Sequence, residues 1–269
     1  MPNGSHGSDW HKMTELVSLV LATGAIQNCA PQSLLIVGEP GSGKTALVER
    51  FSDPDDPSFN GHSKTVGNLS AWGLRNFLKL EAQRGVTHLI VPEFQTLFMR
   101  RQDTWAAVEG LLLQAMAEGV GDYYNGPEAE TYNKAKLGLV ACMTRDAYMG
   151  VRMDFRKTGL GSRFLIVRWN RTQRQIEDAI RRKSKGDFAQ LGKVDLGLPV
   201  VKRVVDIQAN ATELIIGYCR ENFSSEMNRA YDRFVALTRA AALRRGARIA
   251  TSTDWKAVMQ LSRFWTGET

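Results

Sequence analysis

The feature that most constrains this chain is a glycine-rich segment at 38–45, with the sequence GEPGSGKT. It matches the pattern G-x-x-x-x-G-K-[ST] at every fixed position. An apolar run at 33–37 precedes it, and a run of good helix formers at 46–51 follows it. A strand, a glycine-rich turn and a helix in this order form a loop that cradles phosphate groups. The sequence therefore predicts a nucleotide-binding core built around this loop.

Each residue type in this loop has a chemical purpose. The glycines let the backbone curl so that its N–H groups face the β- and γ-phosphates of a nucleotide. Lys44 places a full positive charge on the phosphates, and the hydroxyl of Thr45 can ligate Mg²⁺. We therefore expect ATP and Mg²⁺ as the ligands. The residues expected at the nucleotide are Gly38, Glu39, Pro40, Gly41, Ser42, Gly43, Lys44, Thr45 and Ala46.

A second apolar run, at 88–91, is followed by Pro92 and Glu93. In proteins that hydrolyse nucleotides with such a loop, an acidic side chain at the end of a neighbouring strand holds Mg²⁺ or orients the attacking water. The usual pair there is Asp-Glu, and here Pro92 stands in place of the Asp. We expect Glu93 to polarise the attacking water and to join Thr45 at the metal. Either Glu93 does one of these tasks alone, or hydrolysis is slow.

Two polar residues lie next to further apolar runs that predict strands. Thr144 ends an apolar run at 137–143, where its hydroxyl can hold water or the γ-phosphate, or can simply cap the chain end. Arg163 lies in the sequence GLGSRF, directly before an apolar run at 164–167. An arginine there can stand at a subunit edge and stabilise charge on a neighbour's γ-phosphate. A loop arginine in a surface ion pair is the ordinary alternative.

Arg239 lies on a predicted alanine-rich helix at 236–243. We expect its guanidinium to reach back to the nucleotide from the carboxy-terminal part of the chain. A solvated helix arginine is the alternative, and Arg229, Arg233 and Arg244 compete for the same role.

Apolar strand runs alternate with helical segments through the first two thirds of the chain, and this pattern predicts an α/β fold. The expected core is a parallel sheet with helices on both faces, an αβα sandwich. After Trp169 the chain becomes helical, polar and basic. We divide it into a lead-in and helix, a nucleotide-binding core, a basic linker or helix, and a small helical lid domain. These parts span 1–32, 33–170, 171–197 and 198–269.

A helix is also predicted at 71–83. Ser70 is expected to cap its amino end, and Trp72, Phe77 and Leu80 are expected to face inward.

A turn at 125–127, with the sequence Asn-Gly-Pro, separates two tyrosine-containing runs and predicts a β-hairpin within 122–140. Tyr132, Lys134 and Lys136 alternate along it, so both ammonium groups are expected on one face of a strand. Lysines can bind the phosphate backbone of single-stranded nucleic acid while neighbouring aromatic side chains stack on its bases. Because no base-reading motif is present, we expect such DNA binding to be sequence-tolerant. An ordinary surface hairpin is the alternative.

The net charge of +7 is unevenly distributed. The segment 152–203 contains 14 basic and five acidic residues, a concentration that suits a polyanionic partner or a solvated helix. The three cysteines lie far apart, without the spacing of a disulfide framework or a zinc site. We therefore expect a reducing, cytoplasmic compartment and no metal beyond Mg²⁺. The longest apolar run, at 16–26, is too short to span a membrane, so no membrane partner is expected.

The order of these features resembles the AAA+ ATPase family over residues 34–265. By this resemblance Thr144 is the sensor 1 residue, Arg163 the arginine finger and Arg239 the sensor 2 arginine. The segment 121–137 looks like a presensor-1 hairpin. That hairpin is similar to those of minichromosome-maintenance helicases and of ATPases from phage or mobile-element replication modules.

The resemblance implies an ATP hydrolase that assembles into a hexameric ring or a helical homo-oligomer and binds ATP between subunits. It implies action on DNA, as a replicative helicase motor or a helicase loader of a phage or mobile element. A separate replication or DNA-recognition protein is a further expected partner. Two alternatives are a MoxR-like protein-remodelling ATPase and an ATP-controlled DNA-binding filament regulator with slow hydrolysis. Because Pro92 replaces the Asp, hydrolysis can be slow, and slow hydrolysis favours the filament regulator.

Overall fold

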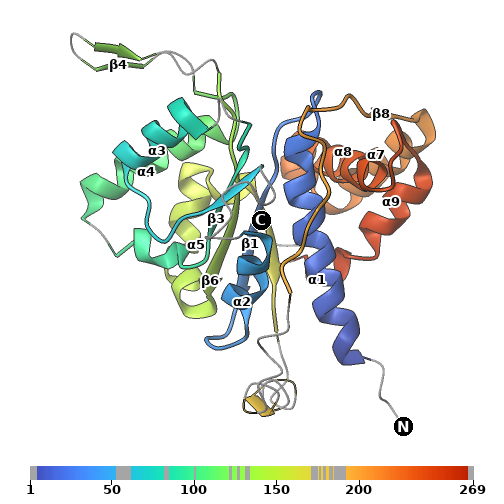
Figure 1. Ribbon diagram of the computed structural model, residues 1–269, viewed down its shortest axis with the longest axis horizontal. Coiled ribbons are helices and arrows are strands. Elements are labelled where there is room, and N and C mark those ends of the chain that lie inside the picture. The colour runs from blue at the N-terminus through green and yellow to red at the C-terminus, as the bar shows by residue number, and fades with distance from the viewer. Residues whose placement is uncertain are drawn as a thin grey trace.

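The fold is that of a computed structural model of the chain. The structure describes residues 5–52, 62–81, 85–99, 101–120, 123–125, 128–130, 134–170, 175, 177, 180–181, 184 and 192–265. Figure 1 shows a central sheet with helices on both sides and a carboxy-terminal helical group next to it.

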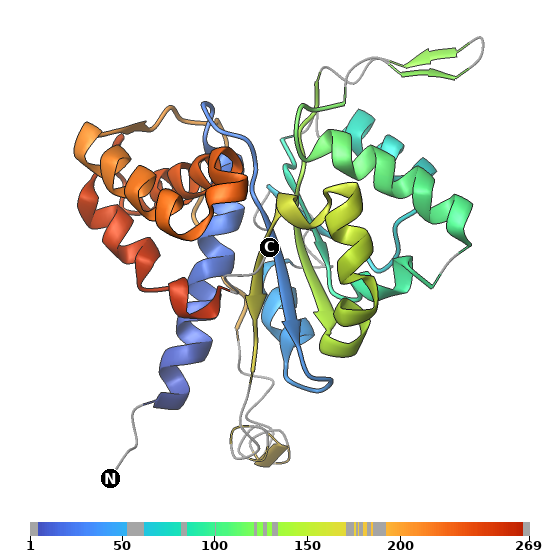
Figure 2. The ribbon, with the colours of Figure 1, turned by 180° about the vertical axis from the view of Figure 1, so that it is seen from behind.

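The sheet has five strands in the order β2-β3-β6-β1-β7, and all its pairs are parallel. The strands are β1 (Ser33–Gly38), β2 (Ser63–Thr65), β3 (His88–Val91), β6 (Gly138–Thr144) and β7 (Phe164–Arg168). Because all strands run the same way, their carboxyl ends share one edge, which faces the bottom of Figures 1 and 2. We call this the carboxyl edge and the opposite one the amino edge.

Eight α-helices are described. They are α1 (Ser5–Ala22), α2 (Lys44–Val48), α3 (Ala71–Asn76), α4 (Gln102–Ala115), α5 (Arg145–Thr158), α7 (Ala209–Asn222), α8 (Met227–Arg244) and α9 (Ser252–Met259). Two minor sheets pair β4 (Tyr123–Asn125) with β5 (Glu128–Glu130), and β8 (Asp206–Ile207) with β9 (Ile249–Ala250).

Alternate residues of β1 enter two separate cores. Leu34 and Ile36 pack in a cluster with buried side chains of α1 and of the carboxy-terminal helices. Leu35 and Val37 pack in a second cluster, to which α3, α4 and α5 contribute. Both faces of the sheet are therefore covered, as continuous apolar strands require.

Helix α1 lies between the sheet and the helices α7, α8 and α9, as both ribbon views show. We call α7–α9 the carboxy-terminal helical group. Its interior is aromatic: the ring of Phe234 lies 5.4 Å from that of Tyr218 and 5.8 Å from that of Trp255. A helix was expected in the first 32 residues, and α1 occupies most of them; its buried residues Leu16 and Val20 join the same core.

The α/β class and the parallel sheet with helices on both faces are confirmed. Four strands match the predicted apolar runs, whereas β2 was missed because Ser63–Thr65 has no apolar residue. The helix predicted at 71–83 is partly wrong: the α-helix ends at Asn76 and a π-helical turn, Phe77–Glu81, follows.

The inward face of α3 also differs from the expected one. Ser70 caps the helix as predicted, accepting a hydrogen bond from the Gly73 amide, and Phe77 is buried. Trp72 and Leu80, however, are 74% and 53% exposed. The buried positions are Leu74, Phe77 and Leu78, which follow the three- and four-residue spacing of a helix face.

The hairpin is confirmed in its backbone, since β4 and β5 pair antiparallel, and it projects from the upper part of the fold in Figures 1 and 2. Tyr132 lies outside the described residues. The expectation that Lys134 and Lys136 share a strand face is wrong. Lys134 lies in a turn with φ of 52°, and Lys136 follows an isolated bridge between Val120 and Ala135.

Most of the predicted basic linker at 171–197 also lies outside the described residues. Its last part runs beside the end of η2 (Glu49–Phe51), where the Val194 amide donates to the Arg50 carbonyl at 2.7 Å.

Candidate nucleotide-binding site

The glycine-rich loop leaves β1 at the carboxyl edge and enters α2. Gly41 and Gly43 have φ of 71° and 88°, a left-handed conformation that glycine adopts without strain. Gly38 is required for a different reason. A Cβ atom there would lie 2.3 Å from the backbone carbonyl oxygen of Trp169, on the continuation of β7. The loop is therefore shaped by conformation at two glycines and by close packing at the third.

Lys44 is enclosed by this loop and only 8% exposed. Its ammonium donates to the carbonyls of Gly38 at 2.9 Å and Glu39 at 2.8 Å, and to the Ser42 hydroxyl at 3.3 Å. Burial lowers the pKa of Lys44, while nearby groups that include the carboxylate of Glu93 oppose the shift. A partly desolvated ammonium held by neutral oxygens interacts strongly with an anion that comes close.

Trp169 fixes the loop from the side of β7. Its indole Nε1 donates to the Ser42 carbonyl at 2.8 Å, and its backbone amide donates to the Val37 carbonyl at 2.7 Å. The Trp10 ring of α1 packs edge-on at 5.7 Å, and Phe264 of the carboxy-terminal segment lies at 6.4 Å. Sequence reasoning treated Trp169 only as a boundary. No motif marks Trp169, and its role depends on β7 lying beside β1 in the sheet.

The carboxyl edge brings Glu93 and Thr144 beside the loop. Thr144 pairs in register with Gly38, and β3, which precedes Glu93, is the next strand beyond β6. Gln95 links the two residues: its side chain donates to the Glu93 carboxylate at 2.6 Å and accepts from the Thr144 amide at 3.0 Å. Gln95 was missed, because no motif marks it.

The hydroxyl of Thr144 accepts from the Ala147 amide at 3.3 Å and so caps α5. The capping alternative therefore describes its side chain in this structure. The next residue, Arg145, lies 3.8 Å from Glu39 in an exposed ion pair. Such a pair contributes little to stability, but it holds a second cation at the loop. Sequence reasoning did not identify Arg145.

Magnesium fits this site only together with phosphate oxygens. Thr45 and Glu93 are the expected protein ligands, and Pro92 supplies no carboxylate. Among the described residues there is no group of three or more His, Cys, Asp or Glu side chains that could hold a metal ion. Mg²⁺ often binds through one or two protein oxygens plus phosphates, so this sparse set suits a metal that arrives with a nucleotide.

Arg163 lies at the amino edge, before β7, and so at the far end of the sheet from its own loop. The strand between them spans roughly 16 Å. Its guanidinium donates to the carbonyls of Gly159 at 2.7 Å and Leu113 at 3.1 Å. Burial, followed by the nearby Arg229 charge, lowers the pKa of Arg163. This residue cannot serve the loop of its own chain.

Arg239 does not lie where the expected role requires. Its Nη1 donates at 2.9 Å to the carbonyl of Asn28, which precedes β1 at the amino edge. Helix α8 packs along that edge, and its Arg233 donates at 2.8 Å to the Ser162 carbonyl there. The structure therefore brings Lys44, Thr45, Glu93 and Thr144 together and leaves Arg239 on the opposite edge.

Comparison with known proteins adds no relative: no protein-family model matches the sequence, and no curated protein matches it significantly. Over the part of the chain that the structure describes, no helix has both the length and the apolar character needed to cross a bilayer.

Proposed function

We propose that this protein is a Mg²⁺-dependent ATP hydrolase of the AAA+ type. The observation that carries the proposal is the enclosure of Lys44 in the loop beside Glu93 and Thr144, at the carboxyl edge of a parallel sheet. Crevices at this edge are where open α/β sheets bind their ligands.

The strand order supports the AAA+ resemblance. Strand β6 lies between β1 and β3, so Thr144 stands between the phosphate loop and the acidic residue. A residue that responds to the γ-phosphate has to stand there, because it must contact both the phosphate and the attacking water. In this proposal Lys44 and the loop amides hold the phosphates, while bound Mg²⁺ neutralises their charge. Glu93, oriented by Gln95, polarises the water.

The position of Arg163 supports assembly. Its place at the amino edge keeps it from its own loop, so a function at the γ-phosphate requires a neighbouring subunit. We infer a ring or helical homo-oligomer in which Arg163 completes the site of the next subunit. Stabilising the charge of a phosphoryl-transfer transition state in this way accelerates hydrolysis by about 10³–10⁵ in other systems.

DNA is the proposed substrate, bound without sequence preference, with a role as a replicative helicase motor or loader. The projecting backbone of β4 and β5 and the exposed Lys134 and Lys136 at its base support this choice. A second candidate is an ATP-controlled DNA-binding filament with slow hydrolysis. The position after β3 favours it, because Pro92 is buried there and supplies no carboxylate.

Steady-state ATP hydrolysis tests the proposal, measured with and without single-stranded DNA over a range of protein and salt concentrations. Lys44→Ala serves as the blank. A rate that rises with protein concentration and with DNA supports an assembled DNA motor. Binding of ATP without hydrolysis favours the filament regulator. A rate that DNA leaves unchanged at low salt overturns the DNA assignment and favours protein remodelling, and failure to bind ATP overturns the proposal as a whole.

A further inference from the structure

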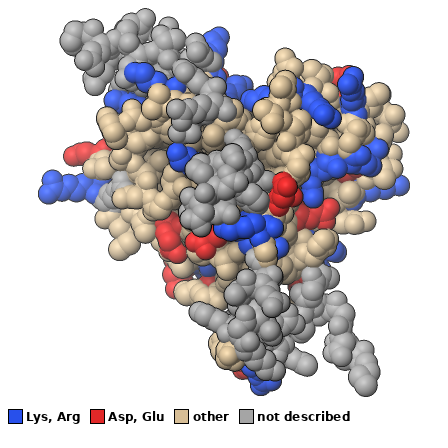
Figure 3. Space-filling model, in the orientation of Figure 1, with Lys and Arg blue, Asp and Glu red and all other residues tan. Residues whose placement is uncertain are grey.

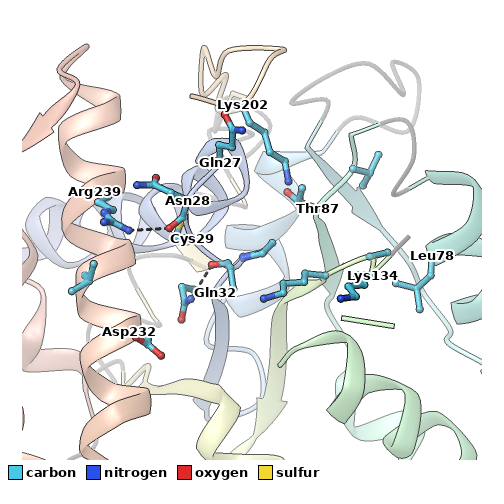
Figure 4. A pocket seen from close by; sticks show the side chains of 16 residues that line it. Gln27, Asn28, Cys29, Gln32, Leu78, Thr87, Lys134, Lys202, Asp232 and Arg239 are labelled. Carbon is cyan, nitrogen blue, oxygen red and sulfur yellow. Dashed lines mark hydrogen bonds between the residues drawn. The ribbon is translucent and has the colours of Figure 1, made fainter. Parts of the chain in front are cut away.

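A second concave site lies on the amino edge, at the opposite end of the sheet from the phosphate loop. It is a pocket of about 960 Å³. Its walls are the loop at 27–32 before β1, residues 86–87 before β3, residues 134–136 before β6, and helix α8. Figure 4 shows side chains from these separate segments converging on one space. The volume falls within the roughly 300–1,000 Å³ typical of small-ligand pockets.

The lining of this pocket is strongly basic. The described residues that line it include one carboxylate, Asp232, and four cationic side chains, Lys134, Lys136, Lys202 and Arg239. Figure 4 shows Lys202, Arg239 and Lys134 coming from three different sides. On the face drawn in Figure 3, Lys and Arg side chains are spread over the upper half, over both the core and the carboxy-terminal helical group. The charges gather from distant parts of the sequence and are not the solvated face of one helix.

Among the described lining residues, there are fewer anions than cations. Arg239 makes one hydrogen bond, to the neutral carbonyl of Asn28, and its buried Nε has no hydrogen-bond partner among the described residues. Cys29 also lines the pocket, but burial raises the pKa of its thiol to about 11, so it carries no charge near neutrality. Of the lining residues that the structure describes, only Asp232 carries a negative charge against the four cations. An anionic ligand would therefore relieve repulsion and satisfy donors at once.

We propose that this pocket binds a phosphate-bearing ligand, at a site separate from the phosphate loop. Phosphate matches the site because a guanidinium and several ammonium groups surround it with donors and positive charge. The amide side chains of Gln27 and Gln32 offer polar contacts for the remainder of such a ligand. The phosphate can come from a free nucleotide or from the backbone of a nucleic-acid strand.

Occupation of the pocket would have a mechanical consequence. Lys134 and Lys136 belong to the sheet side of the pocket, whereas Asp232 and Arg239 belong to the carboxy-terminal helical group. A ligand that bridges them ties this group to the amino edge. The inference does not depend on hydrolysis at the loop.

The test uses the full-length Lys44→Ala variant, in which the phosphate loop is disabled. Binding of a fluorescent ATP analogue and of a labelled single-stranded oligonucleotide is measured separately, each across salt concentrations. At least one probe is expected to bind. Lys136→Ala and Lys202→Ala, added singly, should each weaken that probe about five- to ten-fold and lower the salt slope by about one.

Two further variants distinguish binding from damage to the fold. Asp232→Asn removes the opposing charge and should tighten binding about two- to five-fold, which a destabilised protein would not do. Lys256→Ala, an exposed lysine on α9 outside the pocket, should change nothing.

The outcome also identifies the source of the phosphate. Binding of the ATP analogue alone indicates a nucleotide site, and binding of the oligonucleotide indicates contact with a nucleic-acid backbone. The proposal is overturned if neither probe binds in the Lys44→Ala background. It is also overturned if the Lys136, Lys202 and Asp232 substitutions leave the affinity of every probe that binds unchanged. Because ATP binding at the loop and hydrolysis are measured on the wild type, failure here is separate from failure of the proposed ATPase. An oligonucleotide that does not bind would also count against the proposed DNA substrate, because Lys134 and Lys136 support both proposals.

Discussion

The side-chain amide of Gln95 donates a hydrogen bond of 2.6 Å to the carboxylate of Glu93. The same side chain accepts from the Thr144 amide, so it fixes the carboxylate relative to the end of the neighbouring strand. We regard Gln95 as a positioning residue for the proposed base, because the hydrogen bonds of its side chain among the described residues join it to Glu93 and Thr144 and not to the loop.

Gln95→Ala should therefore lower kcat for ATP hydrolysis roughly ten-fold and leave ATP affinity within about two-fold, by analogy with the loss of other orienting partners. Gln95→Glu should lower kcat further, because it places a second carboxylate beside Glu93. The measurement is steady-state hydrolysis together with equilibrium ATP binding. Gln260→Ala, at an exposed position after α9, is the control. An unchanged kcat in Gln95→Ala contradicts the positioning role.

Trp169→Phe keeps the aromatic ring but removes the indole donor to the Ser42 carbonyl. The loop should become less well fixed, with ATP affinity falling about three- to ten-fold and stability falling by about 1 kcal/mol. Trp72→Phe is the matched control, because Trp72 is 74% exposed and lies on α3, outside the phosphate loop. Isothermal calorimetry and denaturant unfolding measure the two effects. Equal behaviour of both variants would show that the Trp169 hydrogen bond does not support the loop.

Gly38→Ala and Gly110→Ala should have opposite effects on stability. At Gly38 the new methyl group meets the Trp169 carbonyl, whose backbone has to move, so we expect a loss of about 1–3 kcal/mol and weaker ATP binding. Gly110 lies within α4, and a Cβ there has nothing within 4 Å. Alanine favours a helix over glycine by about 0.5–1 kcal/mol, so Gly110→Ala should stabilise the protein. Urea unfolding of both variants checks the two signs.

His88 makes stability depend on pH. It is fully buried at the start of β3, where burial lowers its pKa to about 3, from 6.5. Below pH 6.5 His88 binds a proton in the unfolded chain, whereas in the native state it stays neutral down to about pH 3. Because protonation then favours the unfolded chain, the free energy of unfolding falls as pH falls. The expected slope is about 1.4 kcal/mol per pH unit between pH 6 and pH 4.

The measurement for His88 is the unfolding free energy at several pH values, compared with His88→Gln. The variant should lose this slope, although it starts from a lower stability because the hydrogen bond to the Gln32 carbonyl changes. His11→Gln, at an exposed position of α1, should keep the wild-type slope. Parallel pH profiles of wild type and His88→Gln would count against the assignment.

Local sequence signals predicted the parts of the fold that depend on short-range pattern. The runs at β1, β3, β6 and β7 were apolar because both faces of the sheet are covered, and the loop motif located Lys44 and Thr45. Strand β2 carried no such signal. β2 is an edge strand of the sheet and pairs with β3 through backbone hydrogen bonds. The residue types Ser, Lys and Thr do not predict such a strand.

The remaining differences arise from tertiary placement. Trp169 and Gln95 matter because particular strands are neighbours, and strand order cannot be read from one sequence. Arg239 carried a suitable charge, but the path of α8 along the amino edge takes it to Asn28 and not to the loop. Lys134 alternated with its neighbours as a strand residue would, yet a left-handed turn ends that pattern.

The central claim is that two subunits build each site, one with Lys44 and the other with Arg163. Lys44→Ala retains Arg163 but lacks a working loop, and Arg163→Ala retains the loop but lacks the guanidinium. Each variant alone should hydrolyse ATP at least 100-fold more slowly than the wild type when assembly, checked by light scattering, is intact.

The most direct measurement is the hydrolysis rate of the two variants mixed in equal amounts. The account predicts that mixing restores activity, because some interfaces then join an intact loop to an intact Arg163. Assembled mixtures that stay as inactive as the separate variants, or Arg163→Ala alone at the wild-type rate, would contradict it.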